Sequence, residues 1–192
     1  VIKLDSSGNM LWQKKIGGIG SDYGYAIAVD GSGNVYLNGL QYSDSYGSGD
    51  YGVIKLDSAG NMLWQKKIGG LNKDSGNAIA VDNSGNVYLN GYQSSDSYGG
   101  LDYGVIKLDS SGNMLWQKKI GGLNKDSGRA IAVDGSGNVY LNGKQQASDG
   151  YGSDDYGVMK LHTDQPSDMS LSIGDMSLSI GDMSLSIGDM SL

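Results

Sequence analysis

Short apolar runs alternate with polar turn sequences along the first 161 residues of the chain. In the middle of the chain these runs lie at 51–56, 61–68, 78–81 and 86–90. Each run follows a two-residue rhythm: Ile79 and Val81 face one side of the expected strand, and Ala78 and Ala80 face the other. No window keeps the 3.6-residue period of a helix. The pattern therefore predicts an all-β chain of short strands.

Five-residue turn sequences lie between the first and second runs and between the third and fourth runs of a unit, and they share one chemistry. They read DSSGN, DSAGN, DGSGN or DNSGN. The Asp side chain favours an Asx-turn, and the Gly-Asn pair tolerates a positive φ. We therefore expect tight connections between antiparallel strands.

The same sequence returns along the chain with few changes. Copies of VIKLDSSGNMLWQKKIGG lie at 1–18, 53–70 and 105–122, and copies of LNKDSGNAIAVDNSGNVYLNG lie at 71–91 and 123–143. The copies of these two segments differ only at Ala59, Arg129 and Gly135, and a partial fourth copy begins at Val158 and stops at residue 161. Three units of about 52 residues, starting at 1, 53 and 105, and a stub strand at 158 thus fill residues 1–161.

Four strands in about 50 residues, joined by tight turns, are typical of a blade of a β-propeller. A β-trefoil is the rival fold, because it also has three pseudo-symmetric units of four strands, although its units are usually shorter. Propellers close with about four to eight blades. Three units therefore suggest part of a longer ring, a ring completed by another chain, or an open stack of blades.

Particular residues can be placed on such a blade. Trp12, Trp64 and Trp116 recur once per unit, and we expect them to wedge between successive blades. Paired lysines follow each Trp in the same run, which favours an outer edge for that strand. Because a blade is covered on both faces, Val87 and Leu89 should face one neighbour and Tyr88 the other.

The motifs GVIKLDSSGNMLWQKKIGG and AIAVDGSGNVYLNG resemble the bacterial beta-propeller repeat often abbreviated SBBP, a relative of NHL-type blades. The resemblance covers residues 1–161. It implies a secreted or cell-surface bacterial protein with many repeats, no shared enzymatic activity and no common catalytic residue. In the phasing of NHL blades AIAVD is the innermost strand, so the chain would start and end in the middle of a blade. The family pattern does not account for the C-terminal tail.

The tail has a different repeat. After an expected linker at 162–168, the sequence DMSLSIG recurs with a period of seven through 169–192. Apolar residues alternate with Ser, and Gly-Asp follows as a two-residue turn, which predicts five-residue strands in hairpins. One strand per rung of a small solenoid and a disordered low-complexity tail are the alternatives. The apolar spacing excludes a coiled coil.

Composition narrows the function classes. The chain has 192 residues, a net charge of −7, no Cys and a single His. These numbers exclude disulfides and thiol catalysis, and they make nucleic acid a poor partner. His162 lies in the expected linker and the aspartates lie mostly in turns, so we predict no catalytic residues. The chain begins with Val and has no membrane-spanning run, which predicts no membrane insertion and a mature or excised piece of a soluble chain.

The aspartate-rich turns raise the question of calcium. Asp30, Ser32 and Asn34 carry oxygen at alternate positions, as at the start of a calcium loop. Val35 stands where such a loop needs Gly, and no bidentate Glu follows. We therefore predict turns and no metal or other cofactor, with calcium as the alternative.

The most variable parts of the units are the connections 40–50, 92–102 and 144–155. They are rich in Tyr, Ser, Gly and Asp, as antibody binding loops are, and unconstrained drift of polar loops is the alternative explanation. The candidate binding residues are Tyr42, Asp44, Tyr46, Asp96, Tyr98, Asp149 and Tyr151. A glycan or a protein surface would suit them better than a ligand for a deep pocket.

Together these observations predict a non-enzymatic, extracellular or cell-surface β-propeller-repeat protein with a structural or adhesive role. The near-identical units favour self-association into a larger oligomer or filament, because a strand fits the slot of its neighbour as well as its own. A lectin-like or protein-binding module that uses the variable connections is the alternative function.

Overall fold

The chain forms thirteen strands in the parts that its computed structural model describes, which are residues 1–42, 48–94, 100–122, 124–146 and 154–161. The described residues hold no helix that is long and apolar enough to cross a membrane. The expected linker at 162–168 and tail at 169–192 lie outside these ranges, so both stay predictions.

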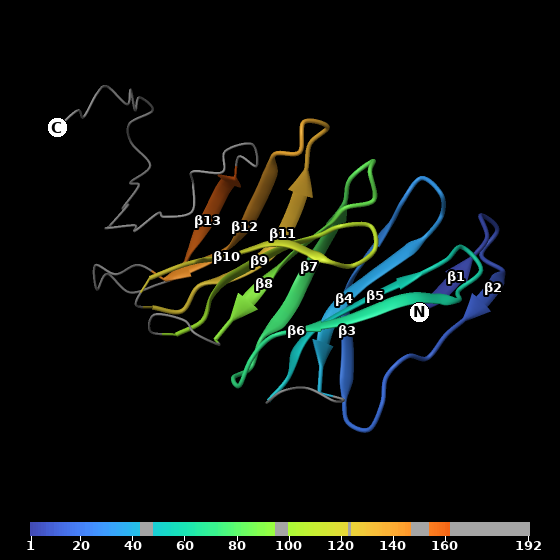
Figure 1. The fold of residues 1–192 in the computed structure, drawn as a ribbon, viewed down its shortest axis with the longest axis horizontal. Coiled ribbons are helices and arrows are strands. Elements are labelled where there is room, and N and C mark those ends of the chain that lie inside the picture. The colour runs from blue at the N-terminus through green and yellow to red at the C-terminus, as the bar shows by residue number, and fades with distance from the viewer. Residues whose placement is uncertain (43–47, 95–99, 123, 147–153, 162–192) are drawn as a thin grey trace.

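The strands group into four antiparallel sheets that lie side by side (Figure 1). Sheet I is β1 (Ile2–Leu4) and β2 (Met10–Gln13). Sheet II is β3 (Asp22–Val29), β4 (Val35–Gln41), β5 (Asp50–Leu56) and β6 (Met62–Ile68). Sheet III is β7 (Ser75–Val81), β8 (Val87–Gln93), β9 (Asp102–Leu108) and β10 (Met114–Ile120). Sheet IV is β11 (Ser127–Val133), β12 (Val139–Gln146) and β13 (Asp154–Leu161).

Each complete sheet has the order of a propeller blade. The AIAV strands β3 and β7 form one edge of their sheets, and the Trp-bearing strands β6 and β10 form the other. Strand β7 contacts both β3 and β11, so the AIAV strands of consecutive sheets lie next to one another. The predicted propeller-type blades and the outer position of the Trp strand are confirmed. The alternative prediction of a β-trefoil is wrong, because the strands of a trefoil would not form separate sheets stacked face against face.

The five-residue turns are built as their sequence predicts. In the first turn the Asp5 carboxylate accepts hydrogen bonds from the backbone N–H groups of Ser7 and Asn9 at 2.9 and 2.8 Å. The glycines of all six turns have φ between 79° and 84°, a conformation that costs glycine little. The geometry of each turn is thus fixed by one Asp and one Gly.

The AIAV strands begin earlier than the alternation of apolar residues predicts. Strand β7 starts at Ser75, three residues before Ala78, and a β-bulge separates Gly76 from Ala78. Across the pair, a side chain on Gly91 of β8 would overlap the carbonyl oxygen of Ser75. Glycine is therefore required on the neighbouring strand, because the bulge brings the two backbones together.

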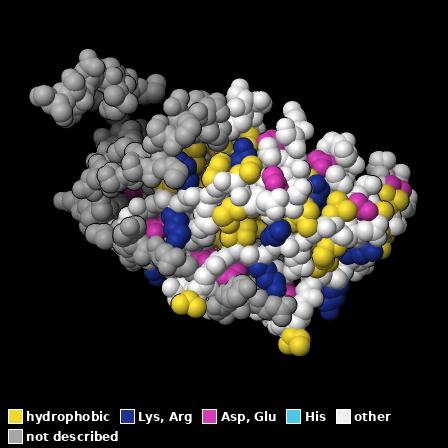
Figure 2. All heavy atoms as spheres, in the orientation of Figure 1, with side chains coloured by type: hydrophobic (Ala, Val, Ile, Leu, Met, Phe, Trp, Pro, Cys, Tyr) yellow, Lys and Arg dark blue, Asp and Glu magenta, His cyan; other side chains and the backbone are white. Residues whose placement is uncertain are grey.

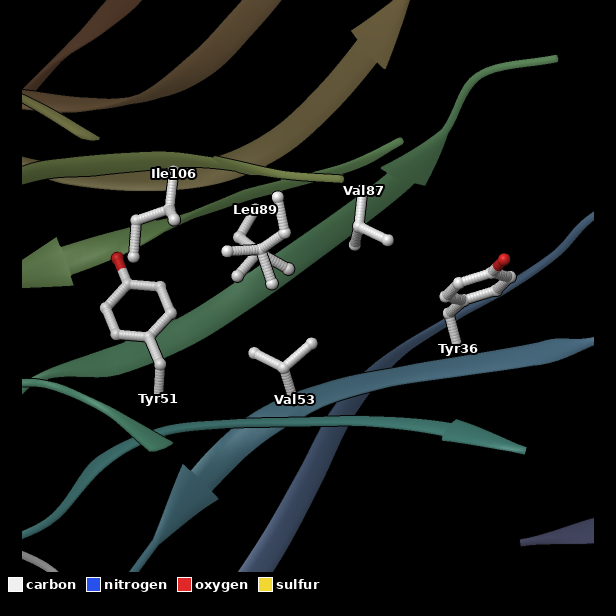
Figure 3. Close-up of a cluster of buried hydrophobic side chains, with 7 residues drawn as sticks. Tyr36, Tyr51, Val53, Val87, Leu89 and Ile106 are labelled. Carbon is white, nitrogen blue, oxygen red and sulfur yellow. The ribbon is translucent and has the colours of Figure 1, made fainter. Parts of the chain in front are cut away.

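The core lies between the sheets. Val87 and Leu89 of β8 pack against Tyr51 and Val53 of sheet II, as Figure 3 shows. Tyr88, between them in sequence, faces the other way into a cluster with sheet IV. The expectation that alternate residues of this strand face different neighbours is confirmed. Sheet III is consequently apolar on both faces.

The tryptophans lie half-buried at the outer part of these interfaces. Trp64 contacts the edge of the Tyr36 ring, with centroids 6.3 Å apart, and its indole N–H donates to the Ser110 carbonyl in sheet III at 3.1 Å. Lys55 donates to the same carbonyl at 3.1 Å. Trp12 and Lys3 of sheet I donate the equivalent hydrogen bonds to the Ser58 carbonyl of sheet II. The rings of Trp116 and Tyr88 make the same edge-to-face contact as those of Trp64 and Tyr36. The Trp side chains of β2 and β6 thus each bind a turn of the following sheet through a hydrogen bond.

Replacement of Trp64 by Ala should lower the free energy of unfolding by about 3–5 kcal/mol, because it removes packing between sheets II and III. Met62→Ala on the same strand is the control, and we expect a loss below about 1 kcal/mol because Met62 is exposed. Urea denaturation measures both. Equal losses for the two variants would contradict the interpretation.

A second comparison uses the repeat itself. Asn90 is buried and its side-chain amide donates to the Ala130 carbonyl across sheets III and IV at 2.8 Å, whereas Asn142, at the same position in sheet IV, is exposed. Asn90→Ala should cost about 1–3 kcal/mol, because the Ala130 carbonyl loses its donor. Asn142→Ala should cost less than about 0.5 kcal/mol. Thermal and urea unfolding of both variants test the difference, and similar costs would refute it.

Candidate functional site

One aspartate per unit fixes the start of each variable connection. The buried Asp74 carboxylate accepts hydrogen bonds from the Gly70 N–H at 3.1 Å and from the Ser94 N–H at 2.8 Å. Gly70 lies in the turn that enters sheet III, and Ser94 begins the connection after β8. Asp22 binds Gly18 and Tyr42 in the same way, and Asp126 binds Gly122 and Gln146.

The far end of the connections is also held by backbone bonds. The Asp74 N–H donates to the Gly49 carbonyl at 2.9 Å, and the Asp126 N–H donates to the Leu101 carbonyl. Gly49 and Leu101 precede the strands β5 and β9. The variable connections of sheets II and III are therefore carried by a uniform, hydrogen-bonded frame. Such a frame suits connections that differ in sequence.

Of the seven candidate binding residues, the structure describes Tyr42 alone; Asp44, Tyr46, Asp96, Tyr98, Asp149 and Tyr151 lie outside the described ranges. Tyr42 is half-buried. The hydroxyl of Tyr92 and then that of Tyr42 raise the pKa of Lys73 by their charge and hydrogen bonding, which outweighs burial of the ammonium group. The ammonium group thus has tyrosines of two neighbouring connections around it.

A cavity of about 550 Å³ opens beside these connections. The strands β3, β7, β8, β11 and β12 and the segments that precede β9 and β11 supply its lining residues, which are Tyr25, Ser75, Asn77, Tyr92, Leu101, Lys125, Asp126, Ser127, Arg129 and Lys144. Its volume lies in the range of small-molecule sites, about 300–1,000 Å³. None of these residues is among the binding candidates taken from the sequence.

A signal for this cavity was present in the repeat. Strands β7 and β11 have the same sequence except at one position, which is Asn77 in β7 and Arg129 in β11. The equivalent residue of β3 is Tyr25. All three line the cavity. Between β7 and β11 this single variable position marks Asn77 and Arg129, whereas β3 also differs at Tyr23.

The turn considered for calcium uses its carboxylate internally. Asp30 accepts the N–H groups of Ser32 and Asn34 at 2.9 Å each, the Asn34 amide at 2.8 Å and the Tyr36 hydroxyl at 3.0 Å. Within the described ranges, no group of three His, Cys, Asp or Glu side chains could hold a metal ion. The oxygens that a cation would need thus already bind the chain's own donors.

The turns should respond to acid. A hydrogen bond from Asn138 holds the pKa of Asp134 at about 2, below the usual 3.8. Because the pKa in the folded state is the lower one, the stabilisation is present above pH 3.8 and is lost as the pH falls through about 2. NMR titration of the Asp134 carboxyl carbon measures the pKa, and Asn138→Ala should return it toward 3.8. A wild-type pKa near 4 would contradict this geometry.

Comparisons with known proteins agree with the arrangement of the sheets. The model of the SBBP family, described as a beta-propeller repeat, matches residues 11–40, 63–98 and 115–144, which together are half of the chain. The first match covers β3 and nearly all of β4, the second β7 and β8, and the third β11 and most of β12, each with most of the preceding Trp strand. The matched unit thus crosses from one sheet to the next.

The chain is also similar to the regulatory protein FlaEY of Caulobacter vibrioides. It is 30% identical over 135 residues, which are 64% of this chain and 14% of the relative. The chain thus spans about one seventh of the length of that protein, so the likeness concerns the repeats. With the matched repeats and the observed sheets in agreement, the chain belongs to the SBBP family of beta-propeller repeats.

Proposed function

We propose that this chain is a non-enzymatic structural and adhesive repeat protein that acts outside the cell or at its surface as part of a larger oligomer or filament. The observation that carries the proposal is that sheet IV and strand β3 of sheet II expose side chains whose counterparts in sheet III pack against a neighbouring sheet. The extracellular location is supported by the resemblance to secreted and cell-surface bacterial repeats.

The outer face of sheet IV presents one half of a sheet-to-sheet interface. Tyr156 and Val158 of β13 are 91% and 75% exposed, whereas Tyr103 and Val105, at the same positions in β9, are 0% exposed. Tyr140 on the neighbouring strand is also exposed, although its counterpart Tyr88 is fully buried. In sheet III, the side chains at these three positions are covered by sheet IV, whereas the described residues place no sheet over those of sheet IV.

Strand β3 of sheet II presents the other half, because sheet I has only two strands in the described residues and packs on β4 and β5. Ile27 and Val29 of β3 are exposed, but the matching Ile79 and Val81 of β7 pack against the core cluster between sheets II and III. Apolar side chains also reach the surface over several sheets in the space-filling view (Figure 2). Exposed apolar surface of this kind favours association.

The outer face of sheet IV and the exposed side of β3 complement each other, because each copies one side of the same internal interface. Stacking of a second copy on sheet IV would therefore reuse a packing that the chain already contains. Such a head-to-tail contact is heterologous and gives a ring if it closes and a filament if it does not. This geometry supports an assembly built from the repeats themselves.

Sedimentation velocity of the purified chain tests the proposal. We expect species larger than the 20.1 kDa monomer at micromolar concentration, and Val158→Asp should shift them to monomer by placing a charge on the exposed face. Gly135→Asp adds the same charge in an open turn and should leave assembly unchanged. A wild-type chain that remains monomeric at every concentration would overturn the proposal.

Ligand recognition by the variable connections, in the manner of a lectin or a protein-binding module, is the second candidate function. It is favoured by the frame of Asp22, Asp74 and Asp126, which anchors connections of different sequence, and by the cavity beside them. This function and assembly are compatible, since the cavity and the exposed face of sheet IV use different residues.

A further inference from the structure

The cavity is lined by residues of sheets II, III and IV. These residues lie far apart in the sequence. Tyr25, Asn77 and Arg129 come from the same position of three consecutive AIAV strands. The Asn77 amide donates to the Gly128 carbonyl at 2.8 Å and so joins β7 to β11. Arg129, the next residue, is exposed. The repeat thus places a guanidinium group beside a fixed contact between two sheets.

The charge of the cavity is opposite to that of the chain. Lys125, Arg129 and Lys144 line it, with Asp126 as the acidic lining residue, whereas the whole chain has a net charge of −7. The Asp126 carboxylate accepts the N–H groups of Gly122 and Gln146, and burial raises its pKa. One carboxylate thus stands against three cationic side chains among the lining residues. A local excess of positive charge selects an anion.

Two tyrosines give the cavity flat apolar surfaces. Tyr25 stacks on Tyr23, with centroids 6.2 Å apart and planes 12° apart, and this contact orients its ring. Tyr92 lines the cavity from β8, and the hydroxyl groups of Ser75 and Ser127 add polar contacts. A tyrosine presents an apolar ring and a polar tip to the same ligand. Tyrosine rings and serine hydroxyl groups beside lysine and arginine side chains suit a small molecule that has an apolar face, several hydroxyl groups and an acidic group.

We propose that this cavity binds an acidic saccharide through a carboxylate on the sugar, with Arg129 as its principal contact. The inference rests on the ligand-recognition function proposed above and names its ligand class. The guanidinium group matches a carboxylate in two parallel hydrogen bonds, and Lys125 and Lys144 add charge. The tyrosine rings pack against the sugar. An acidic peptide shares the charge, but the two tyrosine rings favour a ligand that carries an apolar face beside its acid group.

Isothermal titration calorimetry with trigalacturonic acid tests the proposal on the full chain. Its methyl ester is the matched ligand, because it keeps the sugar skeleton and loses the charge, and triaspartate is the peptide probe. We expect the acid to bind at least tenfold more tightly than either, and its affinity to fall as salt is added. Sedimentation of the same samples records the assembly state.

Arg129→Asn is the informative variant. It makes β11 identical in sequence to β7, so the fold should be kept, and the thermal unfolding curve verifies this. We expect trigalacturonic acid to bind it at least tenfold more weakly. Lys15→Asn removes one positive charge from an exposed residue outside the cavity and should change the affinity less than twofold.

The outcomes separate the two proposals. Equal binding of the acid and its ester, or an affinity unchanged by Arg129→Asn, would overturn this inference and leave ligand recognition standing. Tighter binding of triaspartate with the same dependence on Arg129 would overturn the saccharide class. Absence of binding to all three probes would overturn this inference and would leave ligand recognition by the variable connections, like assembly, to its own test.

Discussion

Packing of one sheet against the next is the interaction on which this molecule depends. The residues of β8 alternate in direction, and both directions are apolar: Val87 and Leu89 contact sheet II while Tyr88 contacts sheet IV. A sheet that is apolar on both faces gains its burial from neighbours, since a four-stranded sheet cannot cover itself. Stability is therefore a property of the stack, and each sheet in the middle contributes to two interfaces.

Hydrogen bonds between sheets fix how the apolar faces meet. The indole of Trp64 and the ammonium group of Lys55 donate to a single carbonyl, that of Ser110, in the following sheet. Further inside, the Asn38 amide donates to the Ala78 carbonyl at 2.8 Å. Apolar contact alone tolerates sliding, whereas buried donors that miss their acceptors carry a cost. These bonds therefore select one register, and the repeat applies it at every interface.

Much of this architecture could be predicted because its causes are local. Alternation along β8, the Asp and Gly of each turn and the lysines beside Trp64 act through neighbours in sequence, so they indicated strands, tight turns and an outer edge. The start of β7 at Ser75 was missed, because Ser and Gly are poor strand formers and the bulge depends on the partner strand. The hydrogen bonds of Asp74 and the position of Arg129 in the cavity lining were missed for a related reason. Their partners lie about 20 residues away or on other sheets, and no short motif records that proximity.

The claim that single sheets lack independent stability can be tested on one sheet of this protein. Residues 22–70 hold the four strands of sheet II, and residues 22–122 hold sheets II and III with the interface between them. Circular dichroism with urea denaturation compares the two fragments. Mutual burial predicts that the single sheet is unfolded in buffer and that the pair unfolds in one cooperative transition. A single sheet that folds and unfolds cooperatively on its own would contradict the account.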